Sequence, residues 1–206
     1  MNKIKVLVVE DNEIMLLYIQ TCLNNIDFEL SAAVTNSADA LFQLENNLPD
    51  IVLLDINLKD DNDGIDVAQV INDKFKIPFI FLTSLADKET LDRAKKTNPS
   101  GYIVKPFKEQ DLLVGLEMAL YNFAQRNNFS QPKLSLSSIN KHLIKPLSER
   151  EFEILQCIYD GKTNQQMASS LYLSVNTIKT HINNLYLKLD ASSRSSVLAR
   201  VRSWQQ

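Results

Sequence analysis

The pattern of apolar residues over the first 124 positions alternates between two periods. Short β-branched apolar runs recur at 4–9, 29–34, 50–55, 78–83 and 101–105. Segments with helical spacing lie between these runs, most clearly the last segment, where apolar residues recur at steps of three and four. Apolar strands that alternate with helices are typical of a parallel sheet covered on both faces. The pattern predicts an α/β, doubly wound domain over residues 1–124 with a five-stranded parallel sheet, and a binding site at the carboxyl ends of its strands.

The pattern changes after this domain. Residues 125–146 are dominated by Asn, Ser, Gln and Lys, which predicts a linker with little core of its own. The alternative is a long surface loop within one domain, although loops of this length are uncommon. Residues 147–206 then show helical spacing throughout, which predicts a small all-α domain.

Four helices are expected in this second domain. The pairs Ser148/Glu151 and Thr163/Gln166 have the spacing of capping boxes and open the first two helices. Ser174 caps the third helix, and the fourth spans about 193–203. A short helix, a tight turn and a second capped helix predict a helix-turn-helix.

The third helix has two distinct faces. Its apolar stripe is expected to pack inward and comprises Ile178, Ile182, Leu185 and Leu189. The opposite face carries side chains whose groups suit base edges in the major groove, namely Asn176, Lys179, Thr180, Asn183 and Leu187. Candidates for phosphate contact are Lys162, Lys188, Arg194, Arg200 and Arg202. A solvated helical bundle with scattered charge is the alternative.

The distribution of charge separates the two halves. Residues 1–125 hold 11 Lys and Arg against 20 Asp and Glu, a net charge of −9, whereas residues 126–206 hold 11 against 5, a net charge of +6. A basic half can approach a polyanion, and the excess acid of the other half can hold a cation. No apolar run approaches the roughly 18–20 residues of a membrane span. We therefore expect a cytoplasmic protein without a membrane partner.

The two cysteines and two histidines add little chemistry. Cys22 and Cys157 lie far apart in helix-like patterns, which favours free buried thiols over a disulfide or a zinc site. His142 and His181 could not build a transition-metal centre without carboxylates.

Polar side chains end the apolar runs of the first domain. Glu10 and Asp11 end the first run and Asp55 ends the third. Carboxylates gathered at one sheet edge repel one another unless a cation lies among them. Oxygen ligands in an incomplete cage suit Mg²⁺, which keeps several waters and shares itself with a phosphate. Thr83 and Lys105, at the ends of the fourth and fifth runs, add a hydroxyl and a positive charge.

This set of groups could make Asp55 a nucleophile toward phosphorus. The metal and Lys105 would neutralise charge on the transferred phosphoryl oxygens, and an acyl phosphate would form. The alternative for each acid taken alone is that it terminates a strand or caps the next helix. The joint pattern is much harder to obtain by chance.

The first 120 or so residues resemble the receiver domain of two-component response regulators. The resemblance rests on VVEDN at 8–12, VLLDINL at 52–58, DG at 63–64, LTS at 82–84 and YIVKPF at 102–107. It implies a flavodoxin-like fold with Asp55 as the phosphoacceptor and Lys105 as the partner of the phosphoryl group. It also implies a cis Lys105–Pro106 bond. The implied Mg²⁺ ligands are Glu10, Asp11, Asp55 and the main-chain carbonyl of Asn57. The stretch 57–66 departs from the family because it is longer and more acidic.

The same resemblance implies a switch. Thr83 and Tyr102 would move together when a phosphoryl group arrives, changing the face made by the fourth helix, the fifth strand and the fifth helix. The alternative for Tyr102 is a strand aromatic that packs on the last helix.

Residues 147–194 closely resemble the LuxR/NarL-type DNA-binding domain. The most specific stretches are LSERE at 147–151, GKTN at 161–164 and S-x-x-TIKTH at 174–181. The resemblance implies base contacts by Lys179, Thr180 and Asn183, and helix packing or phosphate contact by His181. Gln166 stands where glutamate is frequent, which should alter the cap and little else. Such domains usually bind as pairs, so a homodimer through the fourth helix is a further hypothesis.

The leading hypothesis is a regulator whose receiver accepts a phosphoryl group from a sensor histidine kinase and thereby controls binding to double-stranded DNA. The chain would not be a classical enzyme, although it could catalyse its own phosphorylation and dephosphorylation. A phosphohydrolase with an aspartyl nucleophile is disfavoured because Asn57 occupies the place of the second acid. A DNA-binding regulator with a phosphate-independent receiver is disfavoured because the acids, Thr83 and Lys105 are all present.

Overall fold

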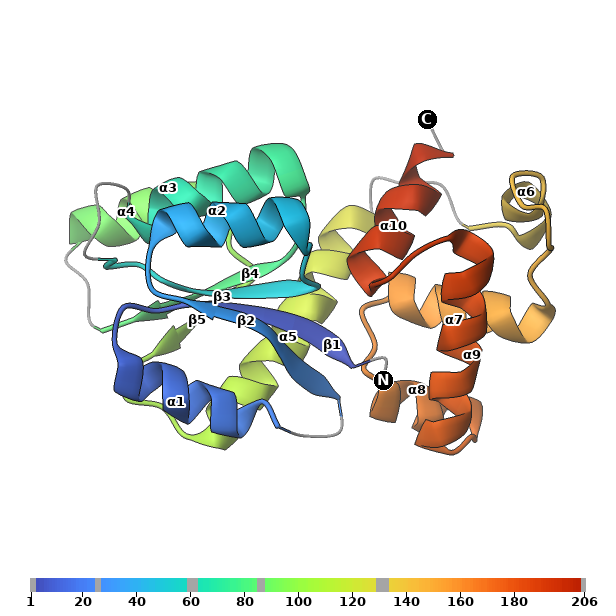
Figure 1. Cartoon of the computed structure of the whole chain (residues 1–206), viewed down its shortest axis with the longest axis horizontal. Coiled ribbons are helices and arrows are strands. Elements are labelled where there is room, and N and C mark those ends of the chain that lie inside the picture. The colour runs from blue at the N-terminus through green and yellow to red at the C-terminus, as the bar shows by residue number, and fades with distance from the viewer. Residues whose placement is uncertain (1–2, 25–26, 59–62, 85–87, 129–133, 205–206) are drawn as a thin grey trace.

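The fold is described from a computed structural model of the chain. The structure describes residues 3–24, 27–58, 63–84, 88–128 and 134–204. Residues 59–62 of the acidic segment 57–66 therefore lie outside the described residues. Two compact parts are visible, an α/β part and an all-helical part, joined by one long helix (Figure 1).

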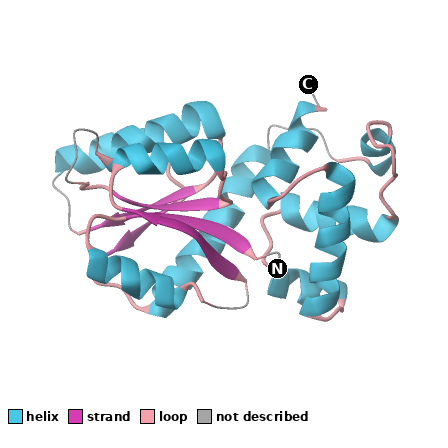
Figure 2. Ribbon diagram, in the orientation of Figure 1, coloured by secondary structure: helices cyan, strands magenta, loops and turns pink. Residues whose placement is uncertain are grey.

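Five parallel strands form the predicted sheet, in the order β2-β1-β3-β4-β5. Each strand coincides with an expected apolar run to within one residue, which confirms the predicted α/β class. The central strands are fully buried on both faces because helices cover the sheet on each side (Figure 2). The strands are β1 (Ile4–Val9), β2 (Phe28–Val34), β3 (Ile51–Asp55), β4 (Phe79–Thr83) and β5 (Gly101–Val104).

The helices of this part divide between the two faces of the sheet. Helices α1 (Glu13–Cys22) and α5 (Glu109–Asn128) share one apolar cluster with the sheet. The other face is covered by α2 (Ser37–Asn46), α3 (Gly64–Val70) with its π-helical continuation η1 (Ile71–Phe75), and α4 (Lys88–Lys96). The order of the strands reverses between β1 and β3. The carboxyl ends of these two strands therefore form the topological switch point.

The helical part has one apolar cluster of its own. The predicted stripe of the third helix is confirmed, since Ile178, Ile182, Leu185 and Leu189 are all fully buried. The predicted caps at Ser148, Thr163 and Ser174 are also confirmed. The helices are α7 (Glu149–Tyr159), α8 (Asn164–Leu171), α9 (Val175–Leu189) and α10 (Arg194–Ser203).

The predicted linker is more ordered than its composition indicated. Helix α5 extends to Asn128, and a short helix α6 (Leu136–Asn140) follows. Ile139 is buried in the cluster of the helical part, and Leu134, Leu136 and Leu143 pack against that cluster. These apolar residues of a polar segment use the core of the neighbouring domain, which the composition of the segment alone did not indicate.

Three smaller points complete the fold. Cys22 and Cys157 are free and buried, as expected. The peptide bond between Lys105 and Pro106 is cis, as the resemblance implied. Among the described residues, no helix combines the length and apolar character needed to cross a membrane.

Candidate functional site

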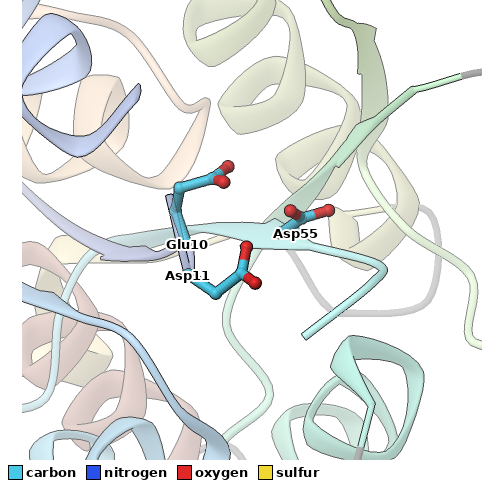
Figure 3. Close-up of side chains that lie close together, drawn as sticks. All are labelled: Glu10, Asp11 and Asp55. Atoms are coloured by element: carbon cyan, nitrogen blue, oxygen red, sulfur yellow. The ribbon is translucent and has the colours of Figure 1, made fainter. Parts of the chain in front are cut away.

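Three carboxylates meet at the switch point of the sheet. The neighbouring strands β1 and β3 pair in parallel through Val9 and Leu54, so Glu10, Asp11 and Asp55 emerge together. One carboxylate oxygen from each acid lies within 4.8 Å of the others (Figure 3). Glu10 and Asp55 are 1% and 5% exposed, which is unusual for acids and shows that the protein holds this charge inside.

Lys105 bridges two of these acids. Lys105 is the residue that follows β5, and its Nζ lies 2.7 Å from Asp55 Oδ2 and 2.5 Å from Glu10 Oε2. The other oxygen of Asp55 accepts a hydrogen bond from the backbone N–H of Asn57 at 3.1 Å. The two oxygens of Asp55 are thus held by an ammonium and an amide, which fixes the orientation of the carboxylate.

Burial and the paired charges perturb the ionisation of this cluster. Burial raises the pKa of Glu10, and the nearby charge of Asp55 adds to this, against the opposing effect of Lys105. Burial alone would lower the pKa of Lys105, but its hydrogen bonds to Asp55 and Glu10 outweigh it and raise the pKa overall. Lys105 therefore stays protonated at neutral pH, and a fixed positive charge faces Asp55.

The donor set suits a hard divalent cation. Each of the three acids offers an oxygen to a common point, and an incomplete cage of carboxylates fits Mg²⁺ with waters in the remaining positions. Lys105 offsets only part of the repulsion among the three acids, and a divalent ion would relieve the rest. Asn57 is exposed beside the site, and the role expected for its main-chain carbonyl stays a prediction.

The two residues expected to form the switch lie on adjacent strands. Thr83 is buried at the end of β4, and its hydroxyl donates to the carbonyl oxygen of Ser84 at 3.0 Å. Tyr102 on β5 is 40% exposed, and its ring lies 5.9 Å from that of Phe81. The coupled movement of Thr83 and Tyr102 stays a prediction.

Gly64 is a site residue whose role the sequence analysis did not identify. A Cβ at this position would lie 1.9 Å from the carbonyl oxygen of Asp55. Only glycine therefore allows α3 to begin so close to the end of β3. Asp63, immediately before it, completes a capping box with Asp66 and pairs with Arg93 at 2.8 Å. The Asp63–Gly64 pair in the sequence was the available signal.

A second candidate site lies on the outer face of α9. Asn176, Thr180 and Asn183 are exposed and Lys179 is half-buried, so the structure brings the predicted base-contacting residues onto one surface. The hydroxyl of Thr180 donates to the carbonyl oxygen of Asn176 one turn earlier. His181 is half-buried on the same helix.

Two predicted DNA contacts are engaged within the protein in this structure. Lys188 Nζ lies 2.7 Å from Glu151 Oε2 and donates to the carbonyl oxygen of Pro146 at 2.9 Å. Arg194 is 4% exposed, and its guanidinium donates to Asn164 Oδ1 at 2.7 Å. Both residues brace the helices of the domain, and contact of either one with DNA phosphates stays a prediction.

Comparison with known proteins gives two family matches and full-length relatives. A family model described as "Response regulator receiver domain" matches residues 6–117, and one described as "Bacterial regulatory proteins, luxR family" matches residues 145–201. The chain is similar to the response regulator protein VraR of Staphylococcus aureus, with 29% identity over 202 residues that cover 95% of this chain and 94% of the relative. It is also similar to VraR of Staphylococcus epidermidis, with 28% identity and the same coverage.

A solved structure supports the fold of the first part. The signal receiver domain of a modulated diguanylate cyclase from Desulfovibrio desulfuricans G20 is 31% identical and has a TM-score of 0.57. The match covers 61% of this chain and 99% of the other.

Proposed function

The chain belongs to the response regulators, with a receiver domain followed by a LuxR-family DNA-binding domain, and we propose that phosphorylation of Asp55 controls its binding to DNA. The domains assigned are 1–124 for the receiver, 125–146 for the linker and 147–206 for the DNA-binding part. The partners would be a sensor histidine kinase and double-stranded DNA, which places the proposed action in the cytoplasm.

One observation carries this proposal. A largely buried ammonium bridges two carboxylates beside a third, and one of the bridged acids, Asp55, is held by the amide of Asn57 as well. Such an arrangement fixes one cation beside Asp55 and leaves an excess of carboxylates that could hold a divalent ion, so that both positive charges would face the phosphoryl oxygens. A chain that needed these acids only as strand ends would have no reason to bury them together.

The chemistry follows from these positions. One carboxylate oxygen of Asp55 would form a bond to phosphorus while the bond from phosphorus to the imidazole nitrogen of the donor breaks. Lys105 would pair with the transferred oxygens, and the hydroxyl of Thr83 would donate to one of them in place of the Ser84 carbonyl. Mg²⁺, held by Glu10, Asp11 and Asp55, would supply charge neutralisation at the phosphoryl group. Later attack by water would release inorganic phosphate and restore the carboxylate.

The test of the acceptor is acyl-phosphate formation with a small donor. Acetyl phosphate and Mg²⁺ should add one phosphoryl group to the wild-type chain, detected by intact mass and removed by hydroxylamine. Asp55→Asn should abolish the addition, whereas Asp73→Asn, an exposed acid elsewhere in the receiver, should leave it unchanged. Equal labelling of all three proteins would remove Asp55 from the mechanism.

The test of DNA binding uses duplexes selected by the wild-type chain from a random library. Lys179→Ala should weaken binding by about 1–3 kcal/mol and relax the selected sequence, since base contacts carry specificity. Lys141→Ala, an exposed lysine outside the α9 face, is the matched control. Titrations at several salt concentrations separate contacts with DNA phosphates, which weaken as salt rises, from base contacts. The same titrations with and without acetyl phosphate measure the effect of phosphorylation on DNA binding. Identical affinity and oligomeric state before and after phosphorylation would favour a phosphate-independent receiver.

A further inference from the structure

The two domains meet at the amino-terminal edge of the receiver sheet, away from the carboxylate cluster (Figure 1). Asp50, which precedes β3, accepts a hydrogen bond at its Oδ1 from the backbone N–H of Ser195 in the first turn of α10, at 2.8 Å. Asp27, which precedes β2, accepts one at its Oδ1 from the backbone N–H of Gln165 in the first turn of α8, at 3.1 Å. Receiver carboxylates thus meet the first turns of two helices of the other domain.

A cavity of about 50 Å³ lies within this contact. Its walls come from both domains, with η1 and α5 on the receiver side and α7 and α10 on the other. Most of its lining is apolar and includes Phe75, Pro78, Phe123, Ile158 and Leu198. One buried water needs roughly 10–15 Å³ of such space, so the cavity has room for roughly three to five non-hydrogen atoms.

The surfaces around the cavity are closely fitted. Gly161 packs so tightly on α5 that a Cβ there would lie 2.6 Å from the carbonyl oxygen of Leu120. Elsewhere in the contact, the amide Nε2 of Gln166 donates to Glu117 Oε2 at 3.2 Å, so the family departure at Gln166 also joins the two domains. The cavity is therefore a defined space between surfaces that hold each other in place.

Basic side chains outnumber acids around this space. Lys76, Arg194 and Arg202 line the cavity against Asp50 alone, three positive charges against one negative charge. Both oxygens of Asp50 already accept hydrogen bonds from backbone N–H groups. Arg194 donates to two neutral oxygens, and its Nε has no hydrogen-bond partner among the described residues. The excess positive charge favours an anion in the cavity.

Arg202 is the side chain most in need of that anion. Its Nε is buried and, within the described parts of the chain, accepts no partner oxygen. Its guanidinium lies 5.8 Å from the ring centre of Phe123, which is a contact with an aromatic face and not with an acid. Burial lowers the pKa of Arg202, and Tyr159 opposes this only in part. A buried donor without an acceptor costs free energy, which an anion bound beside Arg202 would recover.

The lining also distinguishes between kinds of anion. An inorganic oxyanion such as phosphate needs hydrogen-bond donors around its whole surface, and a mainly apolar lining does not supply them. A monocarboxylate can place its charge at Arg202 and its alkyl end against the apolar side chains. The volume of the cavity limits such a ligand to a short chain.

We propose that this cavity is a binding site for a short-chain monocarboxylate of the size of acetate or propionate, with Arg202 as the partner of its carboxylate. The site is separate from Asp55, and the proposal does not rest on phosphorylation. Since the lining belongs to both domains, the ligand binds where the domains meet and stabilises that arrangement by mass action.

The direct test adds sodium propionate to the full-length chain at an ionic strength held constant with sodium chloride. Saturation-transfer NMR of the propionate methyl group should show saturable binding, with a Kd on the order of 1 mM for a ligand of this size. Propionamide has the same shape without the charge and should bind at least about ten-fold more weakly. Hexanoate exceeds the cavity and should also bind more weakly than propionate.

Three results of these titrations would overturn the proposal. Absence of saturable propionate binding would mean that the cavity holds water only. Equal binding of propionamide would remove the role of the anion. Tighter binding of hexanoate would indicate an open apolar surface and not a cavity of this size.

Substitutions on α10 locate the site. Arg202→Gln should weaken propionate binding at least about ten-fold, because a hydrogen bond to a charged group is lost. Arg200→Gln, an exposed arginine on the same helix, is the matched control and should bind propionate like the wild type. Circular dichroism checks that both variants keep their helices. Propionate binding that is equally strong in Arg202→Gln and in the wild type would refute the assignment of Arg202.

Discussion

Replacing Lys105 with methionine isolates the electrostatic role of the ion pairs that Lys105 makes with Glu10 and Asp55. The change keeps most of the side-chain volume but removes the ammonium that lies 2.5 Å from Glu10 and 2.7 Å from Asp55. Removing one partner from a buried ion pair costs about 3–5 kcal/mol, because the remaining charge is buried without compensation. Lys105 is 15% exposed, so solvent screening favours the lower end, about 3 kcal/mol near pH 7.5 without added metal.

The loss should depend on pH in one direction. The folded-state pKa of Glu10 is already raised above its ordinary value of 4.5 in the wild type, and it should rise further without Lys105. Stability tied to a raised pKa is fully present below the ordinary value and is lost as the pH rises through the folded value. Lys105→Met should therefore lose about 3 kcal/mol near pH 7.5 and only about 1 kcal/mol near pH 4.5.

Urea unfolding followed by circular dichroism measures this difference. Lys108→Met, an exposed lysine three positions later, is the matched control and should change stability by less than about 0.5 kcal/mol at either pH. The single tryptophan, Trp204, lies beyond α10 and reports separately on the DNA-binding domain. An equal loss at both pH values, or a loss no larger than that of the control, would refute the assignment of Lys105 as the charge partner of the buried acids.

Three further experiments test other parts of the structure. In thermal melts, Gly64→Ala should lower the unfolding free energy by about 3 kcal/mol or more, because its Cβ would lie 1.9 Å from a backbone oxygen. Gly101→Ala should cost less than about 1 kcal/mol, because its Cβ would make only an ordinary contact with Ile80 Cγ1 at 3.9 Å. Burial would raise the pKa of Glu151, but hydrogen bonds from Lys188 and Ser148 lower it overall. The wild-type DNA-binding domain should therefore lose stability as the pH falls through that lowered pKa. Glu151→Gln should remove this pH dependence in thermal melts followed by Trp fluorescence. Ile182→Ala should cost about 2–5 kcal/mol in the same melts and Leu187→Ala, 81% exposed, almost nothing; similar losses for both would contradict the assigned faces of α9.

The sequence predicted the features that depend on local periodicity. Runs of β-branched residues are found in strands because such residues can be buried on both faces of a parallel sheet, and the acids at the ends of β1 and β3 meet because parallel strands end at one edge. The caps at Ser148, Thr163 and Ser174 were predictable for a similar reason, since each depends on residues only three positions apart.

The features that remained hidden depend on distant backbone atoms. Asp27 and Asp50 look like ordinary loop acids, because their partners are N–H groups more than 100 positions away. The role of Gly64 depends on how close α3 comes to a carbonyl oxygen, and the Asp63–Gly64 pair in the sequence indicates a turn but not this distance. Ile139 appears isolated in a polar segment, and its burial depends on the core of the neighbouring domain.

The position of Asp50 has a consequence for chimeric regulators. An exchange that fuses this receiver to a foreign output module would carry the carboxylate along, but not the helix whose first turn it satisfies. The transplanted acid would then either bind water or meet an unsuitable neighbour, and the fused protein would lose this contact between its domains even with the carboxylate cluster of the receiver intact. Grafts that also transfer the first turns of α8 and α10 should keep the contact, whereas grafts cut at the linker alone should lose it.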